Sequence, residues 1–191
     1  MSIKNVSFIG LGVMGYPMAG HLQNNGYNVT VYNRTTVKAE KWVEEYKGSM
    51  AKTPGEASQN SEIVLMCVGR DEDIIEVMEG EDGILSRVTE GSIIVDHTTA
   101  SAEIARNYYQ KLKDNKLSFL DAPVSGGQAG AENGVLSIMI GGDEKDYNTV
   151  KPVLTSYGKA VELIGPSGSG QIAKMINPVS YTHLTLPTTI E

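Results

Sequence analysis

The sequence predicts an α/β fold with a doubly wound, mainly parallel sheet, and three observations lead to this prediction. Short apolar runs alternate with longer amphipathic runs along most of the 191 residues. Several of the short runs are almost entirely apolar, as in strands that helices cover on both faces. The strand–helix–strand order favours parallel pairing, with the right-handed crossovers that such sheets almost always have.

Strands are expected where apolar and β-branched residues run together, and helices in the amphipathic stretches between them. The expected strands are NVSFIG (5–10), NVTVY (28–32), EIVLMCV (62–68), SIIVD (92–96), LSFLDA (117–122), LSIMIGG (136–142) and KAVELIG (159–165). The expected helices are 14–25, 35–47, 71–79, 100–113, 143–156 and one that begins near Ser169.

The composition argues against several kinds of partner and against a membrane-spanning protein. The net charge of −7 argues against nucleic acid or an anionic membrane as a partner. No apolar run reaches the ~20 residues that a membrane-spanning helix needs. The single cysteine, Cys67, lies in an apolar run and cannot form a disulfide within the chain. We therefore expect a cytoplasmic protein.

A glycine-rich turn follows the first expected strand and opens a helix. It reads Gly10-Leu11-Gly12-Val13-Met14-Gly15, the G-x-G-x-x-G pattern of Rossmann-type dinucleotide-binding domains. The first glycine permits a tight turn, the second lets the backbone approach a pyrophosphate, and the third allows close helix–strand packing. The helix N-terminus then offers free N–H groups to the phosphates.

The end of the second strand predicts which dinucleotide binds. An acid that bonds the ribose 2′-hydroxyl is usual there, but this chain has Asn33 and Arg34. The Arg34 guanidinium could pair with a 2′-phosphate, and the Thr35 hydroxyl could also donate to it. We therefore expect NADP(H) as the preferred cofactor, with NAD(H) as the alternative. The competing interpretation is a solvated Arg34 and a Thr35 that only caps a helix.

Two further stretches are candidates for a substrate site. A glycine-rich loop follows the strand that ends near Asp121, and Ser125, Gly126 and Gly127 could bind a carboxylate there. An ordinary loop fits that spacing equally well. Lys174 and Asn177 lie three residues apart on one face of the last expected helix. A helical lysine is usually solvated, so spacing alone gives Lys174 no role.

Four stretches together resemble the β-hydroxyacid dehydrogenase family, which includes 3-hydroxyisobutyrate dehydrogenase, tartronate semialdehyde reductase and, more distantly, 6-phosphogluconate dehydrogenase. The matching runs are GLGVMGYPMA, VDHTTASAEIAR, DAPVSGGQAGAENGVLSIMIGGDE and GSGQIAKMIN, in this order. The resemblance covers residues 1–177. It implies hydride transfer between NADP(H) and a small, carboxylate-bearing 3-hydroxy acid or its semialdehyde.

The resemblance also implies a role for particular residues. Lys174 would be the catalytic acid/base, and Asn177 would help to hold the substrate. Ser125, Gly126 and Gly127 would bind the substrate carboxylate. The residues expected along the cofactor, beyond the glycine-rich turn and Asn33, Arg34 and Thr35, are Val68, Gly69, Thr98 and Thr99. The resemblance implies no metal site.

The last residues depart from this resemblance. Family members continue the last helix into an all-helical domain that closes the active site and forms a homo-oligomer. Here Pro178 and VSYTHLTLPTT follow, with residues that resist a helix. This stretch resembles a translated sequencing-library adapter. We therefore expect a nucleotide-binding domain over 1–165, the start of an interdomain helix over 166–177, and a non-native tail over 178–191.

Two classes of function compete. The first is an NADP-dependent oxidoreductase, whose truncated chain would bind the cofactor without turnover. The second is a non-catalytic nucleotide-binding or sensor module, since a fold alone does not determine a function. Lys174 discriminates between them, because a sensor has no need of it. An imine reductase is a further alternative, but the lysine and the Ser-Gly-Gly loop count against it.

Overall fold

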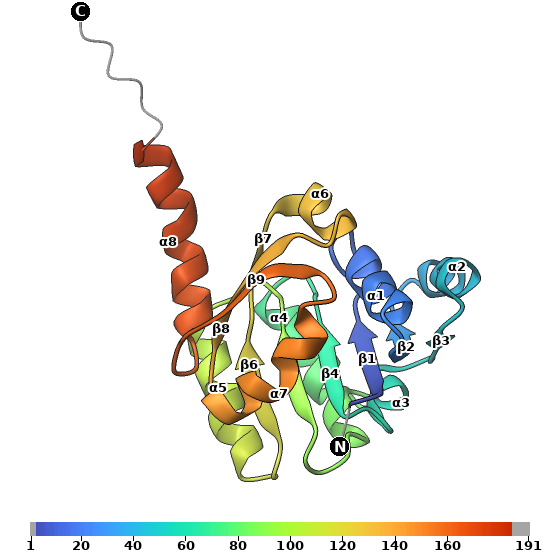
Figure 1. The fold of residues 1–191 in the computed structure, drawn as a ribbon. Helices are drawn as coiled ribbons and strands as arrows, with labels where there is room; N and C mark the ends of the chain where they lie inside the picture. Colours follow the sequence, from blue (N-terminus) through green and yellow to red (C-terminus); the bar gives the residue numbers. More distant parts are fainter. Residues whose placement is uncertain (1–2, 185–191) are drawn as a thin grey trace, which may run out of the picture.

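The fold was analysed in a computed structural model that describes the backbone of residues 3–184 and the side chains of residues 3–176. One sheet runs through the molecule, in the order β3-β2-β1-β4-β5-β6-β8-β7, and β9 pairs with β8 (Figure 1). The strands are β1 (Asn5–Ile9), β2 (Asn28–Tyr32), β3 (Ser49–Met50), β4 (Ile63–Met66), β5 (Ile93–Asp96), β6 (Ser118–Asp121), β7 (Val124–Ser125), β8 (Leu136–Gly141) and β9 (Gly158–Gly165).

Helices cover both faces of this sheet (Figure 1). They are α1 (Gly15–Asn24), α2 (Thr36–Tyr46), α3 (Pro54–Ser58), α4 (Asp71–Glu79), α5 (Ala102–Lys113), α6 (Gly127–Glu132), α7 (Glu144–Leu154) and α8 (Ser169–Leu184), with a 3₁₀ turn η1 (Ile84–Ser86). The expected doubly wound, mainly parallel α/β fold is confirmed.

Alternate residues of the central strands enter two separate hydrophobic cores. In β4, Ile63 and Leu65 pack in the core beneath α1, α2 and α7, whereas Val64 and Met66 pack beneath α3, α4 and α5. All four side chains are fully buried. This burial on both faces explains why the strand is a continuous apolar run rather than an alternating one.

The strands at one edge of this mainly parallel sheet include antiparallel pairs. The six strands from β3 to β6 in the sheet order are parallel, but β8 runs antiparallel to β6, and β9 is parallel to β8. The stretch expected to be a glycine-rich loop contains β7 and α6, and Val124 of β7 pairs antiparallel with Ile138. The chain therefore turns back on itself instead of making the crossover that parallel strands require.

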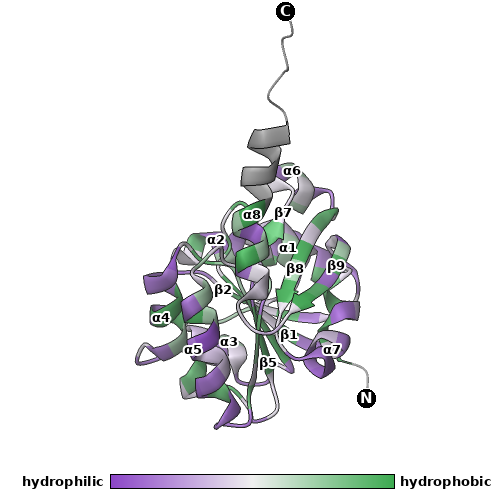
Figure 2. Cartoon of the chain, turned by 90° about the vertical axis from the view of Figure 1, so that its left-hand side faces the viewer, coloured by the Kyte–Doolittle hydropathy of each residue, from purple (hydrophilic) through white to green (hydrophobic). Residues whose placement is uncertain are grey.

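Helix α8 leaves the domain at the end where α6 also lies (Figure 1). Ile172, Met175 and Ile176 are exposed on it. Figure 2 colours part of this helix as hydrophobic. The expectation that the residues after Asn177 resist a helix is wrong for the backbone, because α8 continues to Leu184. An internal proline removes one helical hydrogen bond, and α7 likewise contains Pro152.

In the part of the chain that the structure describes, no helix has both the length and the apolar character to cross a membrane.

Candidate nucleotide and substrate site

The three glycines of the turn after β1 differ in what a side chain would meet there. Gly10 has a φ of +96°, and a Cβ there would collide with the Cys67 carbonyl oxygen. A Cβ on Gly15 would collide with the Gly10 carbonyl oxygen and lie 2.9 Å from Phe8 Cε1. A Cβ on Gly12, by contrast, would meet nothing within 4 Å. Gly10 and Gly15 therefore shape the turn, while Gly12 faces open space.

That open space is a cleft of about 610 Å³ that begins at the N-terminus of α1. Among the described residues, the backbone N–H groups of Gly12, Val13 and Met14 donate to no protein acceptor. Free N–H groups at the positive end of a helix suit a pyrophosphate, so these residues fit the expected dinucleotide. The cleft is lined by ten residues expected along the cofactor: Gly10, Gly12, Val13, Met14, Gly15, Asn33, Arg34, Thr35, Val68 and Gly69.

Asn33 ties the turn to the end of β2. Its Oδ1 accepts the N–H of Leu11 at 2.8 Å, and its Nδ2 donates to the Thr35 carbonyl oxygen at 3.1 Å. The Gly10 N–H donates to the Tyr32 carbonyl oxygen at 2.9 Å. Leu11 is buried and does not line the cleft. Asn33 therefore uses its amide to position the glycine-rich turn.

Arg34 lies at the other end of the cleft and is 78% exposed. Its Nη1 is 3.7 Å from Asp73 Oδ1 and 3.8 Å from Glu76 Oε2. Thr35 occupies the N-cap position of α2, where its side chain makes no capping hydrogen bond. Thr35 therefore occupies the N-cap position, as one interpretation expected, but its hydroxyl makes no capping bond. The hydroxyl is thus available to a ligand beside Arg34, as the other interpretation requires.

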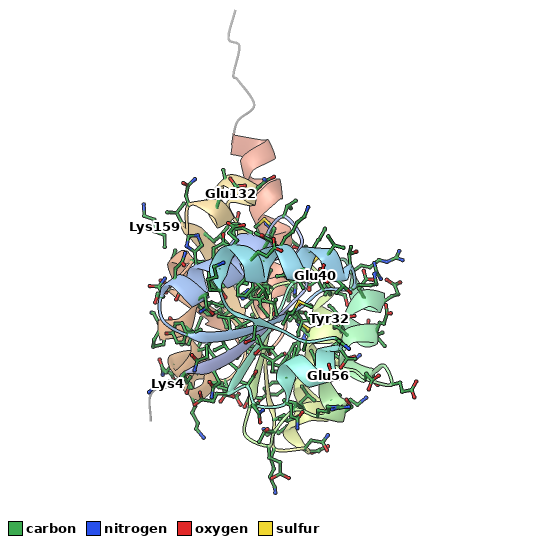
Figure 3. All side chains as sticks on the ribbon, turned by 90° about the vertical axis from the view of Figure 1, so that its right-hand side faces the viewer. Lys4, Tyr32, Glu40, Glu56, Glu132 and Lys159 are labelled. Carbon is green, nitrogen blue, oxygen red and sulfur yellow. The ribbon has the colours of Figure 1, made fainter. Side chains whose placement is uncertain are left out.

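Tyr32 marks this end of the cleft. In the view of Figure 3 it lies between α2, which carries Glu40, and α3, which carries Glu56. Sequence reasoning missed several lining residues near it: Lys38, Lys52, Thr53, Asp73, Glu76 and Val77. Lys38 could have been found, because it lies in the first turn of α2, four residues after Arg34. The others come from segments that only the fold brings together.

Thr98 and Thr99 do not line the cleft. Thr98 is buried behind it, and its Oγ1 accepts the Val68 N–H at 3.0 Å. Thr99 is exposed beyond it. The Thr98 N–H donates to Asp96 Oδ1 at 2.8 Å, so Thr98 fixes the cleft wall at Val68 to the end of β5.

Asp121 and Gln171 connect α8 to the sheet, and sequence reasoning missed both. The Asp121 carboxylate accepts the N–H of Gly168 at 2.7 Å and of Gln171 at 3.0 Å. The Gln171 side chain donates to the Thr98 carbonyl oxygen at 2.7 Å and accepts the Ala100 N–H at 3.1 Å. Asp121 and Gln171 are both buried.

Lys174 follows Gln171 by three residues, so the two side chains share a face of α8. It is half-buried and does not line the cleft. Because Gln171 on the same face bonds Thr98, Lys174 lies on the side of α8 that is turned toward the ends of the strands. The side chain of Asn177 lies outside the described residues.

Ser125, Gly126 and Gly127 lie where β7 ends and α6 begins. Gly126 and Gly127 have φ angles of +135° and +62°, which favour glycine. Helix α6 packs against α1, and His21 Nε2 lies 3.0 Å from the carbonyl oxygens of Ala131 and Glu132. Figure 1 places β7 and α6 at the end of the molecule toward which α8 extends. The three residues do not line the cleft.

Burial controls the charge state of the groups beneath the site. Asp96 and Asp121 are direct neighbours on β5 and β6. Burial raises the pKa of Asp96 to about 7 and raises the pKa of Asp121 as well. Burial also raises the pKa of the Cys67 thiol to about 12, which leaves it a neutral thiol and a poor nucleophile.

His97 is buried and joins two other parts of the fold. Its Nδ1 lies 2.7 Å from the Ala122 carbonyl oxygen, and its Nε2 lies 2.8 Å from the Tyr157 hydroxyl. Burial lowers the pKa of His97 to about 4, so the ring is neutral. Within residues 3–176, no three His, Cys, Asp or Glu side chains group together as a metal site.

The fold and the cleft define a dinucleotide-binding α/β domain. Residues 5–165 match the model of the NAD binding domain of 6-phosphogluconate dehydrogenase. The chain therefore belongs to that family, and the resemblance found in the sequence is confirmed.

Two curated relatives illustrate the match. An uncharacterized oxidoreductase of Shewanella frigidimarina is 55% identical over 177 residues, which are 93% of this chain and 61% of the relative. A probable 3-hydroxyisobutyrate dehydrogenase-like protein of Arabidopsis thaliana is 38% identical over 97% of this chain and 55% of its own length. The chain thus spans less than two thirds of the length of these relatives.

Solved structures share the fold. A Mycobacterium tuberculosis 3-hydroxyisobutyrate dehydrogenase with L-serine has a TM-score of 0.88 at 27% identity, covering 95% of this chain and 60% of that one. Psf3 in complex with NADP⁺ and 2-OPP has a TM-score of 0.86 at 27% identity, covering 92% and 62%. A Myxococcus stipitatus imine reductase variant with NAD⁺ has a TM-score of 0.81 at 19% identity, covering 96% of this chain and 62% of that one. At this identity the likeness is one of fold alone.

Proposed function

We propose that this chain is the cofactor-binding part of an oxidoreductase that prefers NADP(H) over NAD(H). The observation that carries the proposal is the cleft itself. At one end, Gly12 and the free N–H groups of Val13 and Met14 suit a pyrophosphate. At the other end, the exposed guanidinium of Arg34 suits a 2′-phosphate.

The proposed reaction is hydride transfer between this cofactor and a small 3-hydroxy acid or its semialdehyde. The relatives named as 3-hydroxyisobutyrate dehydrogenases support this substrate class, as does the solved neighbour that carries L-serine. Ser125 and the N–H groups of Gly126 and Gly127 would bind the substrate carboxylate. Asn177 would contribute to the same site.

Lys174 would act as the acid/base. Bound nicotinamide would supply the hydride in the reducing direction, in which the substrate oxygen needs a proton, and accept it in the oxidising direction, in which that oxygen loses one. As an ammonium, the Lys174 Nζ would donate a hydrogen bond to that oxygen and then the proton. As a neutral amine, it would take the proton back in the reverse direction. Such assistance is typically worth about 10²–10⁴ in rate.

Other parts of the proposal rest on the same resemblance. The active protein would have the length of the relatives and would form a homo-oligomer, and residues 178–191 would not belong to it. The cytoplasm remains the proposed compartment, on the ground of a single cysteine. An imine reductase is the second candidate, and Lys174 with the Ser125–Gly127 segment favours the hydroxy-acid reaction over it.

The test separates chemistry from cofactor binding. In a protein that has the relatives' length, Lys174→Met should abolish turnover of 3-hydroxyisobutyrate and L-serine with NADP⁺, and leave NADPH affinity unchanged. Lys159→Met is the matched control, because Lys159 is an exposed residue of β9. Retained turnover in the Lys174 variant would remove this lysine from the mechanism.

A further inference from the structure

The end of β2 lacks the usual acid, but two carboxylates of α4, Asp73 and Glu76, lie beside it. Asp73 and Glu76 come from a segment some forty residues further along the chain and line the same end of the cleft as Arg34. They lie three residues apart, so they share one face of α4. Arg34 Nη1 lies 3.7 Å from the first and 3.8 Å from the second.

These side chains can still respond to a ligand. Arg34 is 78% exposed, and both distances to the carboxylates exceed that of a good hydrogen bond. Ion pairs of this kind are weak and screened by salt. A bound 2′-phosphate would therefore compete readily for the guanidinium.

The backbone brings the carboxylates close to the cofactor path. A Cβ on Gly69 would collide with Asp73 Oδ2, so the absence of a side chain there lets this carboxylate lie against the strand end. Burial raises the pKa of Tyr32, the charge of Glu76 raises it further and the charge of Arg34 lowers it, so both charges act on this ring. Gly69, Tyr32 and Asp73 all line the cleft.

We infer that Asp73 and Glu76 determine cofactor specificity by lowering the ratio of NADP(H) to NAD(H) affinity. This inference rests on the proposed function and deepens it. Carboxylates beside Arg34 repel the 2′-phosphate that the guanidinium attracts, and they can accept a hydrogen bond from the 2′-hydroxyl of NAD(H). The same cluster would thus let the site accept either dinucleotide.

Binding of NADPH and NADH to the 191-residue chain tests this inference by isothermal titration at low and at high salt. Asp73→Asn and Glu76→Gln should each raise the ratio of NADPH to NADH affinity by roughly threefold to tenfold at low salt. The matched control is Glu72→Gln, which makes the same charge change on α4 at a side chain that pairs with Arg70 at 3.3 Å. The ratio should not change in this control.

The outcomes separate the inference from the proposed function. A rise in the two variants and not in the control supports the inference, whether NADPH binds more tightly or NADH more weakly. An unchanged ratio, or an equal rise in the control, overturns it. Arg34→Ala tests the proposed preference itself. If that variant leaves the ratio unchanged while the α4 variants raise it, the role of Arg34 fails and the inference about α4 stands.

Discussion

The Asp121 carboxylate accepts the backbone N–H of Gln171 at 3.0 Å, and this contact fixes the first turn of α8 to the sheet. The other Asp121 oxygen accepts the Gly168 N–H at 2.7 Å. The first N–H groups of a helix have no partner within it, and a buried acceptor stabilises them. Asp121 therefore sets the direction in which α8, and with it Lys174, leaves the domain.

Asp121→Ala should detach this turn. It leaves two buried N–H groups without an acceptor, so we expect the free energy of unfolding to fall by roughly 1–3 kcal/mol. Hydrogen exchange should rise at residues 168–171. Asp114→Ala, at an exposed position at the end of α5, is the control. If urea unfolding and exchange give the same result for both variants, Asp121 does not anchor the helix.

Substitutions at two glycines of the turn should affect stability and cofactor binding separately. Gly15→Ala would force a Cβ against the Gly10 carbonyl oxygen, and we expect it to cost roughly 1–3 kcal/mol of stability. Gly12→Ala points into open space, so stability should change by no more than about 1 kcal/mol.

The effect of Gly12→Ala should appear in cofactor affinity rather than in stability. The folded Gly12→Ala protein should lose at least about tenfold in NADPH affinity, because the new methyl group occupies the path of the pyrophosphate. Thermal unfolding and nucleotide titration measure the two effects. Full NADPH affinity in Gly12→Ala would place the phosphates elsewhere.

The contact between His97 and Tyr157 should stabilise the fold rather than serve the reaction. Tyr157→Phe removes the hydroxyl that lies 2.8 Å from His97 Nε2 and leaves a buried ring nitrogen without its partner. We expect a loss of roughly 1–3 kcal/mol in urea unfolding, with NADPH affinity retained. A loss of affinity at unchanged stability would contradict a purely structural role.

Asp96 should make stability fall as pH rises. Burial raises its pKa from 3.8 to about 7, so the folded protein keeps a proton that the unfolded chain releases. Between these pH values the unfolded state binds fewer protons, and the carboxyl's contribution to stability decreases with rising pH. Above about pH 7 both states are ionised and the loss is complete.

Asp96→Asn removes this titration while keeping an oxygen that can accept the Thr98 N–H. Its stability relative to the unmodified chain should therefore improve from pH 4 to pH 7 and then level off. Urea unfolding over this range measures the difference in the free energy of unfolding between variant and unmodified chain. For Asp114→Asn, at an exposed position, this difference should not change with pH. A flat difference for Asp96 would mean that it is ionised throughout.

Much of the fold could be predicted from the sequence, because burial on both faces makes strands such as β4 continuously apolar. The conformation of the glycine-rich turn could also be predicted, since its glycines meet steric requirements within a few residues. The antiparallel edge could not, because the turn-back depends on the pairing of Val124 with Ile138. The α4 carboxylates and the Asp121–Gln171 contact join residues far apart in the chain, and no local pattern indicates such contacts.

The central claim is that the cleft binds a nicotinamide dinucleotide with a preference for the 2′-phosphate. Titration of the unmodified 191-residue chain with NADPH and with NADH, followed by calorimetry, tests it most directly. The account predicts one site for both dinucleotides, with NADPH bound more tightly and more strongly weakened by salt. Binding of neither dinucleotide, or tighter binding of NADH, would contradict it.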